Sequence, residues 1–231
     1  MRANGDVRWV WTQRADGDLA VPVSGASPTV MRAYQHTLAS LVEGRPVSWL
    51  RQVHGHAVAS VPPGVIHSGT HADAQVTQST HAALAVFTAD CAPVLLCSVG
   101  ARVPVLGVAH VGWKGLLAGV LDATVAAMQT HSRHPIEAYL GPCIGAGCYE
   151  FTGPQLNELT HQLGPQILTV SKAGTQTLDL RAALSLALAR HGVPLDVSDA
   201  VCTACDGEHY SSHRARAESF RQALLAWVQP S

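Results

Sequence analysis

Residues 84–96 read LAVFTADCAPVLL, and this stretch indicates the fold class more clearly than any other. It contains one apolar run of strand length, Leu84–Thr88, and the start of a second, Val94–Val99. Pro93 directly precedes the second run. Similar short runs rich in Val and Leu, bounded by Gly, Pro or polar residues, predict further strands over Val47–Val53, Ala57–Val61 and Val103–His110.

Helices are expected at three places. The run Leu116–Met128 places apolar residues at helical spacing on one side. The run Leu180–Arg190 does the same, with Asp179 as its N-cap and Gly192 just past its end. A third helix is predicted over Thr29–Leu41, after a stretch in which Gly, Pro and Ser cluster.

The C-terminal part adds predicted strands near Ala200–Thr203 and over Ala223–Val228. The second of these could equally be a short helix, because its Ala-Leu-Leu-Ala-Trp run has no clear period. Strands and helices that do not alternate strictly favour an α+β fold over a doubly wound α/β sheet.

Composition excludes several classes of partner. The chain has 47% apolar and 13% charged residues, a net charge of -1 and no basic run, so we expect a globular protein that binds no nucleic acid. No segment resembles a signal peptide or approaches the roughly 18 apolar residues of a membrane span, which predicts a cytoplasmic protein without a membrane partner. No apolar surface stripe compels assembly, so we expect a monomer binding a small molecule.

The six cysteines are Cys91, Cys97, Cys143, Cys148, Cys202 and Cys205. In a reducing compartment, metal binding or catalysis is a better interpretation of special cysteines than disulfides. Cys202-Thr-Ala-Cys205 has the spacing of a redox pair or of half a zinc ribbon. The spacing of Cys143 and Cys148 is too loose for the other half, so we do not expect a structural zinc ion there.

Three predicted strand ends carry His54, Cys91 and His110. Because the ends of neighbouring strands converge in space, two imidazoles and a thiolate can meet there, and this set suits zinc with a fourth position open for water or substrate. On spacing alone, ordinary roles remain open: a small core cysteine, a surface histidine, and a simple strand–helix connection at His110–Gly115.

Charged residues near these positions suggest supporting roles. Asp73 and Asp90 can accept the free N–H of a ligand histidine or act as general acid or base, and a turn or cap carboxylate is the alternative for each. Lys114 opens the helix after His110 and is either a phosphate contact or a solvated lysine. Arg214, with Arg51 as a weaker candidate, can contact phosphate or ribose through its guanidinium.

Six segments resemble, in order, the signature motifs of the laccase-domain family, formerly labelled multicopper polyphenol oxidases and now described as zinc-dependent purine nucleoside phosphorylases with adenosine deaminase activity. These segments are QVHG at 52–55, ADAQVT at 72–77, LAVFTADCAPVLL at 84–96, VAHVGWKG at 108–115, LGPCIGAGCYEF at 140–151 and CTACDGEHYSSHR at 202–214. They cover roughly residues 45–215, whereas residues 1–45 match weakly and the segment Ala215–Gln222 departs from the family pattern.

The resemblance implies one layered α/β/β/α-type domain over residues 1–231 that acts on a purine nucleoside and phosphate. It places His54, Cys91 and His110 where the family keeps its metal ligands, with zinc expected and copper less so. We expect catalytic roles for Asp73, Asp90 and Cys91. Arg51, Lys114 and Arg214 are the expected substrate contacts.

Other functions fit the same residues. Cys91 and His110 could form the nucleophile–base pair of a hydrolase or amidase, and editing of peptidoglycan precursors is a related function suggested for the family. A copper-dependent polyphenol oxidase needs several copper sites, and only one convincing ligand set is present. A non-enzymatic accessory role in cell division or envelope assembly predicts no turnover of any nucleoside.

Overall fold

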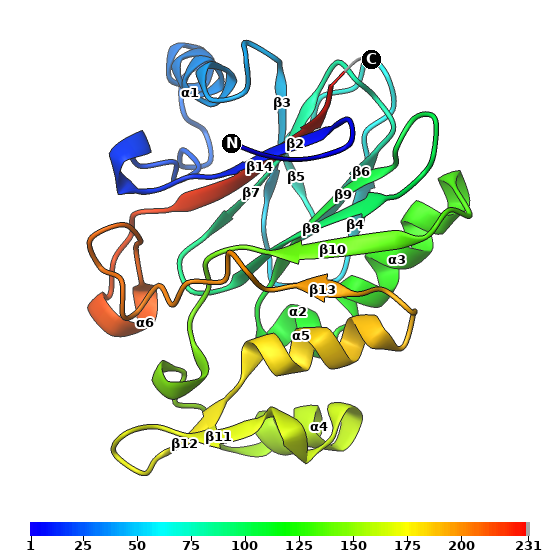
Figure 1. Cartoon of the computed structure of the whole chain (residues 1–231). Coiled ribbons are helices and arrows are strands. Elements are labelled where there is room, and N and C mark those ends of the chain that lie inside the picture. Colours follow the sequence, from blue (N-terminus) through cyan, green and yellow to red (C-terminus); the bar gives the residue numbers. More distant parts are fainter. Residues whose placement is uncertain (230–231) are drawn as a thin grey trace.

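The two apolar runs of residues 84–96 form strands β7 (Ala83–Thr88) and β8 (Ala92–Ser98), and these strands belong to different sheets. In a computed structural model that describes residues 1–229, two six-stranded sheets pack against each other (Figure 1). The last two residues of the expected domain, 230 and 231, lie outside the described residues. The turn at Asp90 and Cys91 therefore passes from one sheet to the other.

The first sheet mixes parallel and antiparallel pairs. Its strand order is β1 (Arg2–Asn4), β2 (Val7–Trp11), β14 (Gln222–Val228), β7, β3 (Val47–Arg51) and β5 (Ser68–His71). Strand β3 runs parallel to both β7 and β5, whereas β14 runs antiparallel to β2 and β7. As a result, the carboxyl ends of β3 and β7 meet at one edge of this sheet.

The second sheet has the strand order β13 (Leu195–Asp196), β10 (Ile136–Leu140), β8, β9 (Leu106–Val111), β6 (Ala74–Thr77) and β4 (Val58–Ser60). Its central strands β8, β9, β10 and β6 pair antiparallel, and parallel pairs stand at both edges. A separate hairpin joins β11 (Leu168–Val170) to β12 (Gln176–Leu178).

Alternating side chains of the central strands build the layers. In β7, Leu84 and Val86 face the second sheet, while Phe87 contributes to the cluster on the other face. In β9, Leu106 and Val108 pack between the sheets. Because both faces of these strands are buried, they are apolar except near their ends, without the polar alternation of a surface strand.

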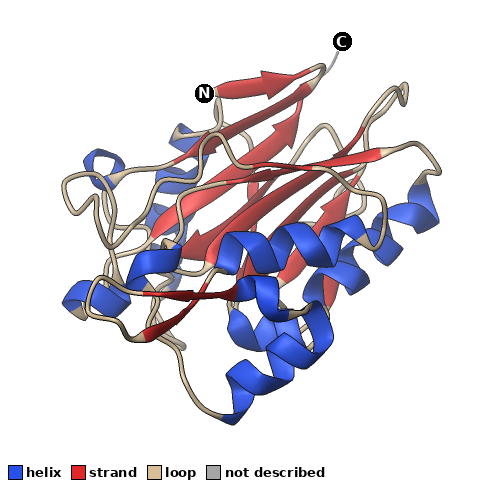
Figure 2. Cartoon of the chain, turned by 60° about the horizontal axis from the view of Figure 1, so that its bottom comes forward, coloured by secondary structure: helices blue, strands red, loops and turns tan. Residues whose placement is uncertain are grey.

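Helices cover the two outer faces. Helix α1 (Pro28–Ser40) packs on the first sheet, and α2 (Trp113–Leu117), α3 (Val120–His131) and α5 (Leu180–Ala189) pack on the second. Helix α4 (Pro154–Leu163) lies against α5, and Figure 2 shows these helices gathered along one side of the sheets. Helix α6 (His213–Arg216) and the short helices η1 (Arg14–Asp16), η2 (Ala146–Cys148) and η3 (Pro165–Ile167) complete the chain. The α+β prediction and its α/β/β/α layering are confirmed.

Local predictions succeeded where buried runs were long. The five strands predicted over residues 47–110 and the helices predicted over Thr29–Leu41 and Leu180–Arg190 appear within a few residues of their predicted bounds, whereas two other predictions differ from the structure. The helix predicted over Leu116–Met128 is broken between α2 and α3, where Gly119 adopts a φ of 81° that a continuing helix cannot accept. The strand predicted at Ala200–Thr203 is wrong: this segment is a turn with a single bridge from Cys202 to Cys143.

The segment Ala223–Val228 is a strand, not a helix. It forms β14 between β2 and β7, and every residue of it is buried. A strand buried on both faces has no period of two, which explains why its sequence pattern was ambiguous. Among residues 1–229, no helix is long and apolar enough to cross a membrane.

Candidate metal centre

The site lies where the carboxyl ends of β3 and β7 meet the end of β9. His54 follows β3, Cys91 occupies the turn between β7 and β8, and His110 lies within β9. Their nearest ligand atoms, two imidazole nitrogens and one sulfur, all lie within 4.8 Å of one another. The two imidazole rings meet edge to face with centroids 4.8 Å apart. Parallel strands and one antiparallel neighbour thus bring together residues that are far apart in sequence.

Backbone strain accompanies this convergence. His54 has a φ of 59° and Asp90 a φ of 91°, both in the left-handed region that residues with a side chain rarely adopt. Such strain costs on the order of 1 kcal/mol or more per residue and persists where the surrounding structure enforces it. Here it turns the chain sharply at two strand ends.

Asp73, directly before β6, contacts the residues of the site on the side away from the cavity. Its carboxylate is completely buried and accepts hydrogen bonds from the backbone amides of His54 (2.9 Å) and Gly55 (2.7 Å). It also lies 2.9 Å from Nδ1 of His110. Although burial raises the pKa of Asp73, the hydrogen bonds from His110 and Gly55 lower it below its ordinary value. A charged carboxylate at Nδ1 keeps the proton there and leaves Nε2 of His110 free as a ligand atom.

The thiol and imidazole shift each other's protonation. Although burial raises the pKa of Cys91, the neighbouring His110 and His54 lower it to about 6. Although burial lowers the pKa of His110, Cys91 and Asp73 raise it to about 9. The protein therefore favours a thiolate at Cys91 near neutral pH, which is the form that binds metal and also the form that attacks electrophiles.

The backbone at Gly112 passes close to the sulfur of Cys91. Gly112 lies so near that a Cβ atom on it would be 2.8 Å from Sγ of Cys91 and 3.4 Å from Cδ2 of His54. Any larger residue would displace these side chains. Gly112, two residues after His110, is thus required by the packing around the site.

The donor set fits one metal ion. Two imidazole nitrogens and a thiolate suit zinc, and their mutual separations are short enough for a single ion to contact all three. Three protein ligands leave a position open toward the neighbouring cavity. The carboxylate behind His110 supplies the supporting contact that metal-binding histidines ordinarily have.

A cavity of about 570 Å³ opens directly over these residues. His54, Cys91, His110 and Asp90 line it, together with Arg51 and Arg214. This volume is within the usual range for small-molecule sites, about 300 to 1,000 Å³. Two of the site residues expected from sequence, Asp73 and Lys114, are not part of the cavity lining. Asp73 is buried behind His110. Lys114 is exposed, and its Nζ atom lies 5.5 Å from the centroid of the Trp113 ring.

Asp90 has a structural position beside the cavity. Its carboxylate accepts hydrogen bonds from the hydroxyl of Thr203 (2.7 Å) and the backbone amide of Arg214 (2.6 Å). It therefore fastens two distant segments, residues 202–206 and helix α6, to the turn that carries Cys91.

Arg214 is held in place over an aromatic ring. Its guanidinium lies 5.0 Å from the centroid of Tyr149 and donates to the carbonyl oxygen of Glu150 at 2.5 Å. Arg51 donates to the carbonyl oxygen of Pro22 at 3.3 Å. Both guanidiniums keep further N–H donors that can meet an anion in the cavity.

Sequence reasoning missed several residues of the lining. Tyr149, Trp113, Phe87, His213 and Arg221 all face the cavity. Tyr149 and His213 stand within the motifs at 140–151 and 202–214, beside residues that were singled out. Arg221 could not be found, because it follows helix α6 in the segment that departs from the family pattern.

Gln52 was also missed, and its contacts explain its place in the QVHG motif. Its side-chain amide donates to the carbonyl oxygen of Phe87 and accepts from the amide of the same residue, both at 2.7 Å. These two side-chain hydrogen bonds join the chain after β3 to the end of β7, beyond the last backbone pair between the two strands. They fix the spacing between His54 and Cys91.

Comparison with known proteins gives consistent relatives. A sequence model described as "Multi-copper polyphenol oxidoreductase laccase" matches residues 12–229. A purine nucleoside phosphorylase of Streptomyces griseus is 34% identical and covers 97% of this chain and 95% of its own, and one of Mycobacterium bovis is 33% identical with 96% and 92% covered.

Solved structures agree on the fold. A Neisseria meningitidis protein assigned to family DUF152 superposes with a TM-score of 0.82 at 30% identity, covering 99% of this chain and 96% of that one. A Bacillus licheniformis protein, titled hypothetical, has the same TM-score of 0.82 at 22% identity, with 97% and 94% covered, which supports the fold alone.

Proposed function

The chain belongs to the family described as multi-copper polyphenol oxidoreductase laccase, and we propose that it is a zinc-dependent purine nucleoside phosphorylase that also deaminates adenosine. The observation that carries the proposal is the open donor set of His54, Cys91 and His110 at the floor of the cavity. The names of relatives at 33–34% identity support the reaction class. The deaminase activity is what the family resemblance implies, and zinc is proposed because it fits the donor set.

Zinc is proposed over copper because of the number of sites. Two imidazoles with one thiolate form a borderline-soft set that both ions accept, whereas multicopper oxidation requires several linked copper sites. When bound, zinc would supply Lewis-acid polarisation and a water of lowered pKa, which is the nucleophile that hydrolytic deamination needs. His54, Cys91 and His110 are proposed as its ligands.

The arginines of the cavity fit the second substrate of phosphorolysis. Arg51, Arg214 and Arg221 line the same space as His213, so a phosphate dianion there would meet several cationic or hydrogen-bonding groups. In phosphorolysis a phosphate oxygen bonds to ribose C1′ while the bond from C1′ to the base breaks. Arg221 is proposed for the role of phosphate contact that was expected of Lys114, because Arg221 lines the cavity and Lys114 does not.

Aromatic side chains offer a surface for the base. Phe87, Trp113 and Tyr149 line the cavity near the metal ligands. Trp113 and Tyr149 are themselves braced by Phe151, with ring centroids 5.3 and 5.6 Å away. A planar purine gains both apolar burial and ring contacts from such walls.

Asp73 and Asp90 are proposed as positioning residues. Asp73 is completely buried and contacts His110, so it fixes the proton of that ligand. Asp90 holds the backbone of Arg214 and so positions a proposed phosphate contact. Cys91, the third member of the expected catalytic group, is proposed as a metal ligand.

One observation favours a second candidate, a cysteine hydrolase. The pKa of Cys91 is lowered by His110, and the Nδ1 atom of His110 contacts Asp73. These three residues could therefore act as nucleophile, base and orienting carboxylate. Such an enzyme would keep its activity in the presence of chelator and lose it on alkylation of Cys91. The metalloenzyme would lose activity in chelator and recover it with zinc.

The direct test incubates the protein with adenosine and phosphate and separates adenine, inosine and hypoxanthine. Adenine that forms with ribose 1-phosphate, and only when phosphate is present, indicates phosphorolysis, and inosine indicates deamination. Substituting His54→Ala should abolish both products, whereas His56→Ala, an exposed histidine two residues away, should leave them unchanged. Absence of every purine product from the zinc-loaded wild type would contradict the proposal.

A further inference from the structure

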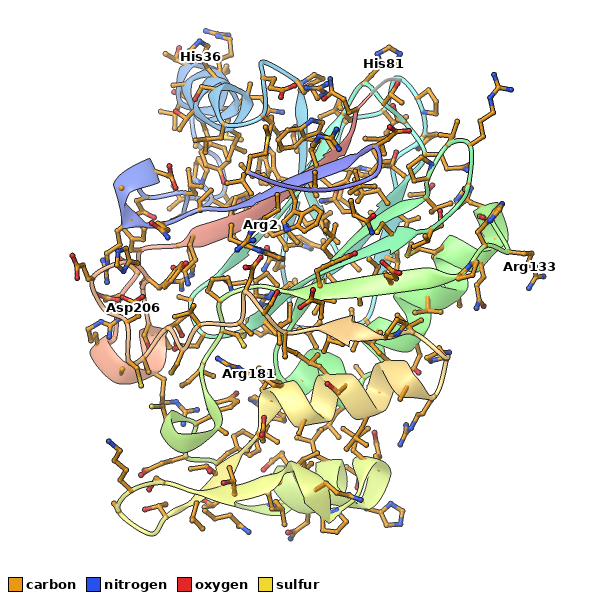
Figure 3. All side chains as sticks on the ribbon, viewed as in Figure 1. Arg2, His36, His81, Arg133, Arg181 and Asp206 are labelled. Atoms are coloured by element: carbon orange, nitrogen blue, oxygen red, sulfur yellow. The ribbon has the colours of Figure 1, made fainter. Side chains whose placement is uncertain are left out.

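Three cysteines outside the first site converge on one point. Cys148 ends the short helix η2, while Cys202 and Cys205 belong to the turn after β13. The three sulfurs all lie within 4.8 Å of one another, and those of Cys148 and Cys205 are 3.4 Å apart. Asp206, which follows Cys205 directly, is labelled in Figure 3 at the edge of the molecule beside α6. Cys205 is exposed and Cys148 and Cys202 are half-buried, so the cluster is open to solvent on one side.

The Cys202 sulfur has the surroundings of a metal thiolate. The backbone amide of Gly145 donates to it at 3.1 Å, and the amide of Cys205 donates to the carbonyl oxygen of Cys202 at 3.2 Å, which closes the turn. A Cβ atom on Gly145 would lie 3.0 Å from the Cys202 sulfur, so a glycine lets the amide approach. An amide donor at the first sulfur of a Cys-x-x-Cys turn stabilises negative charge there, and a thiolate is the form that binds metal.

The turn is fixed by contacts from outside it. The Arg216 guanidinium donates to the carbonyl oxygens of Thr203 and Ala204, each at 3.1 Å. The hydroxyl of Thr203, between the two cysteines, donates to Asp90. The turn therefore holds its two sulfurs in a set geometry that does not depend on a bond between them.

We propose that Cys148, Cys202 and Cys205 bind a second soft metal ion, zinc, through three thiolates, with a fourth position facing solvent. Each thiol releases its proton to solvent as the ion binds. A disulfide between Cys148 and Cys205 would use only the closest pair and leave Cys202 without a role. From the sequence we did not expect a structural zinc ion here, because the spacing of Cys143 and Cys148 is too loose for half a zinc ribbon. In the structure Cys143 is buried apart from the cluster, and Cys148 alone joins the Cys-x-x-Cys pair.

Metal content tests this site independently of catalysis. Wild type loaded with zinc and desalted should carry about two zinc ions per chain, and His54→Ala and Cys205→Ser about one each. Cys205 is exposed, so its serine variant should fold. Glu208→Ser, at an exposed position in the same segment, is the matched control and should keep wild-type content. Equal zinc in Cys205→Ser and wild type would overturn the inference.

A second measurement guards against loss of folding in the variant. In the wild type, zinc should protect Cys148, Cys202 and Cys205 from iodoacetamide, read by peptide mass, and chelation should expose all three. Cobalt loaded into His54→Ala should show sulfur-to-cobalt charge-transfer absorption. A Cys148–Cys205 disulfide in zinc-loaded protein, with no protection of Cys202, would overturn the proposal. Since these readouts omit nucleosides, failure of the proposed activity leaves them interpretable.

Discussion

At the scale of single residues, the buried carboxylate of Asp73 organises the first site. It is bonded to His110 and to the backbone that carries His54, so one side chain orients two proposed ligands. Its position directly before β6 was visible in the sequence, but its burial was not. The sequence left general acid–base catalysis open for Asp73, whereas a completely buried group behind His110 has no path to substrate.

We predict that Asp73→Asn lowers zinc affinity by about 10- to 100-fold, because an amide that donates to Nδ1 moves the imidazole proton to Nε2. Competition with a chromophoric chelator measures this affinity. Asp122→Asn is the matched control, since Asp122 also pairs with a histidine, His191, but at the surface. An unchanged zinc affinity in Asp73→Asn would show that the carboxylate does not set the tautomer.

Gly112→Ala tests the space around Cys91. The added methyl group would lie 2.8 Å from the sulfur, so we expect zinc affinity to fall at least tenfold as the sulfur moves from its position. Gly147→Ala is the control, because nothing lies within 4 Å of a Cβ atom there. Chelator competition on both variants gives the comparison, and equal affinities would contradict the crowding argument.

At the scale of elements, the segment around α6 shows what sequence patterns could not supply. Glu218 accepts hydrogen bonds from the amide of Ser212 (2.7 Å) and the hydroxyl of Ser211 (3.0 Å), and it pairs with Arg14 and Arg216. These contacts join η1 near the N-terminus to the segment after α6. Both segments lie outside the six sequence motifs, although the family model matches residues 12–229, and they meet at one carboxylate.

Acid should loosen this junction. Although burial raises the pKa of Glu218, its bonds to Ser212 and Arg14 lower it to about 2. Its folded pKa is below its unfolded value of about 4.3, so its stabilisation is complete above that pH and is lost as the pH falls toward 2. We expect Glu218→Gln to cost about 1 kcal/mol at pH 7, after allowing for solvent screening, and less at pH 3.

Urea unfolding at both pH values measures the difference, with Glu208→Gln as an exposed control in the same region. If Glu218→Gln were as destabilising at pH 3 as at pH 7, the charge of Glu218 would have no part in the junction.

Element boundaries were predictable where burial imposed a pattern. Leu180–Arg190 carried its N-cap and its apolar stripe in the sequence, and α5 ends within one residue of the prediction. The turn at Cys202–Cys205 looked like a strand because Ala200–Thr203 is partly apolar. Its real form depends on Arg216 and Asp90, which lie far away in the sequence and leave no local signal.

At the scale of the whole molecule, the interface between the two sheets sets the geometry of the site. The turn at Asp90 and Cys91 connects a strand of one sheet to a strand of the other, and His54 and His110 come from opposite sheets. The sequence could predict the strands and, through its motifs, the three residues that meet at the site. It could not predict which strands share a sheet, because pairing between distant strands depends on the packing of both faces.

Leu106→Ala tests that interface. Leu106 is completely buried between the sheets, so we expect its truncation to lower the free energy of unfolding by about 2 to 5 kcal/mol. Val23→Ala, at a position 79% exposed, should change it by less than about 0.5 kcal/mol. Urea denaturation followed by tryptophan fluorescence compares the two, and similar stabilities would show that the sheets do not share a packed core.

The measurement that tests the central claim most directly is the rate of phosphorolysis as a function of zinc bound at the first site. Zinc is removed by chelation and added back in steps, with bound metal counted at each step in Cys205→Ser. We predict that the rate of adenine formation rises in proportion to zinc, and that His54→Ala stays inactive at every step. Full activity in zinc-free protein, lost only on alkylation of Cys91, would contradict the metalloenzyme account.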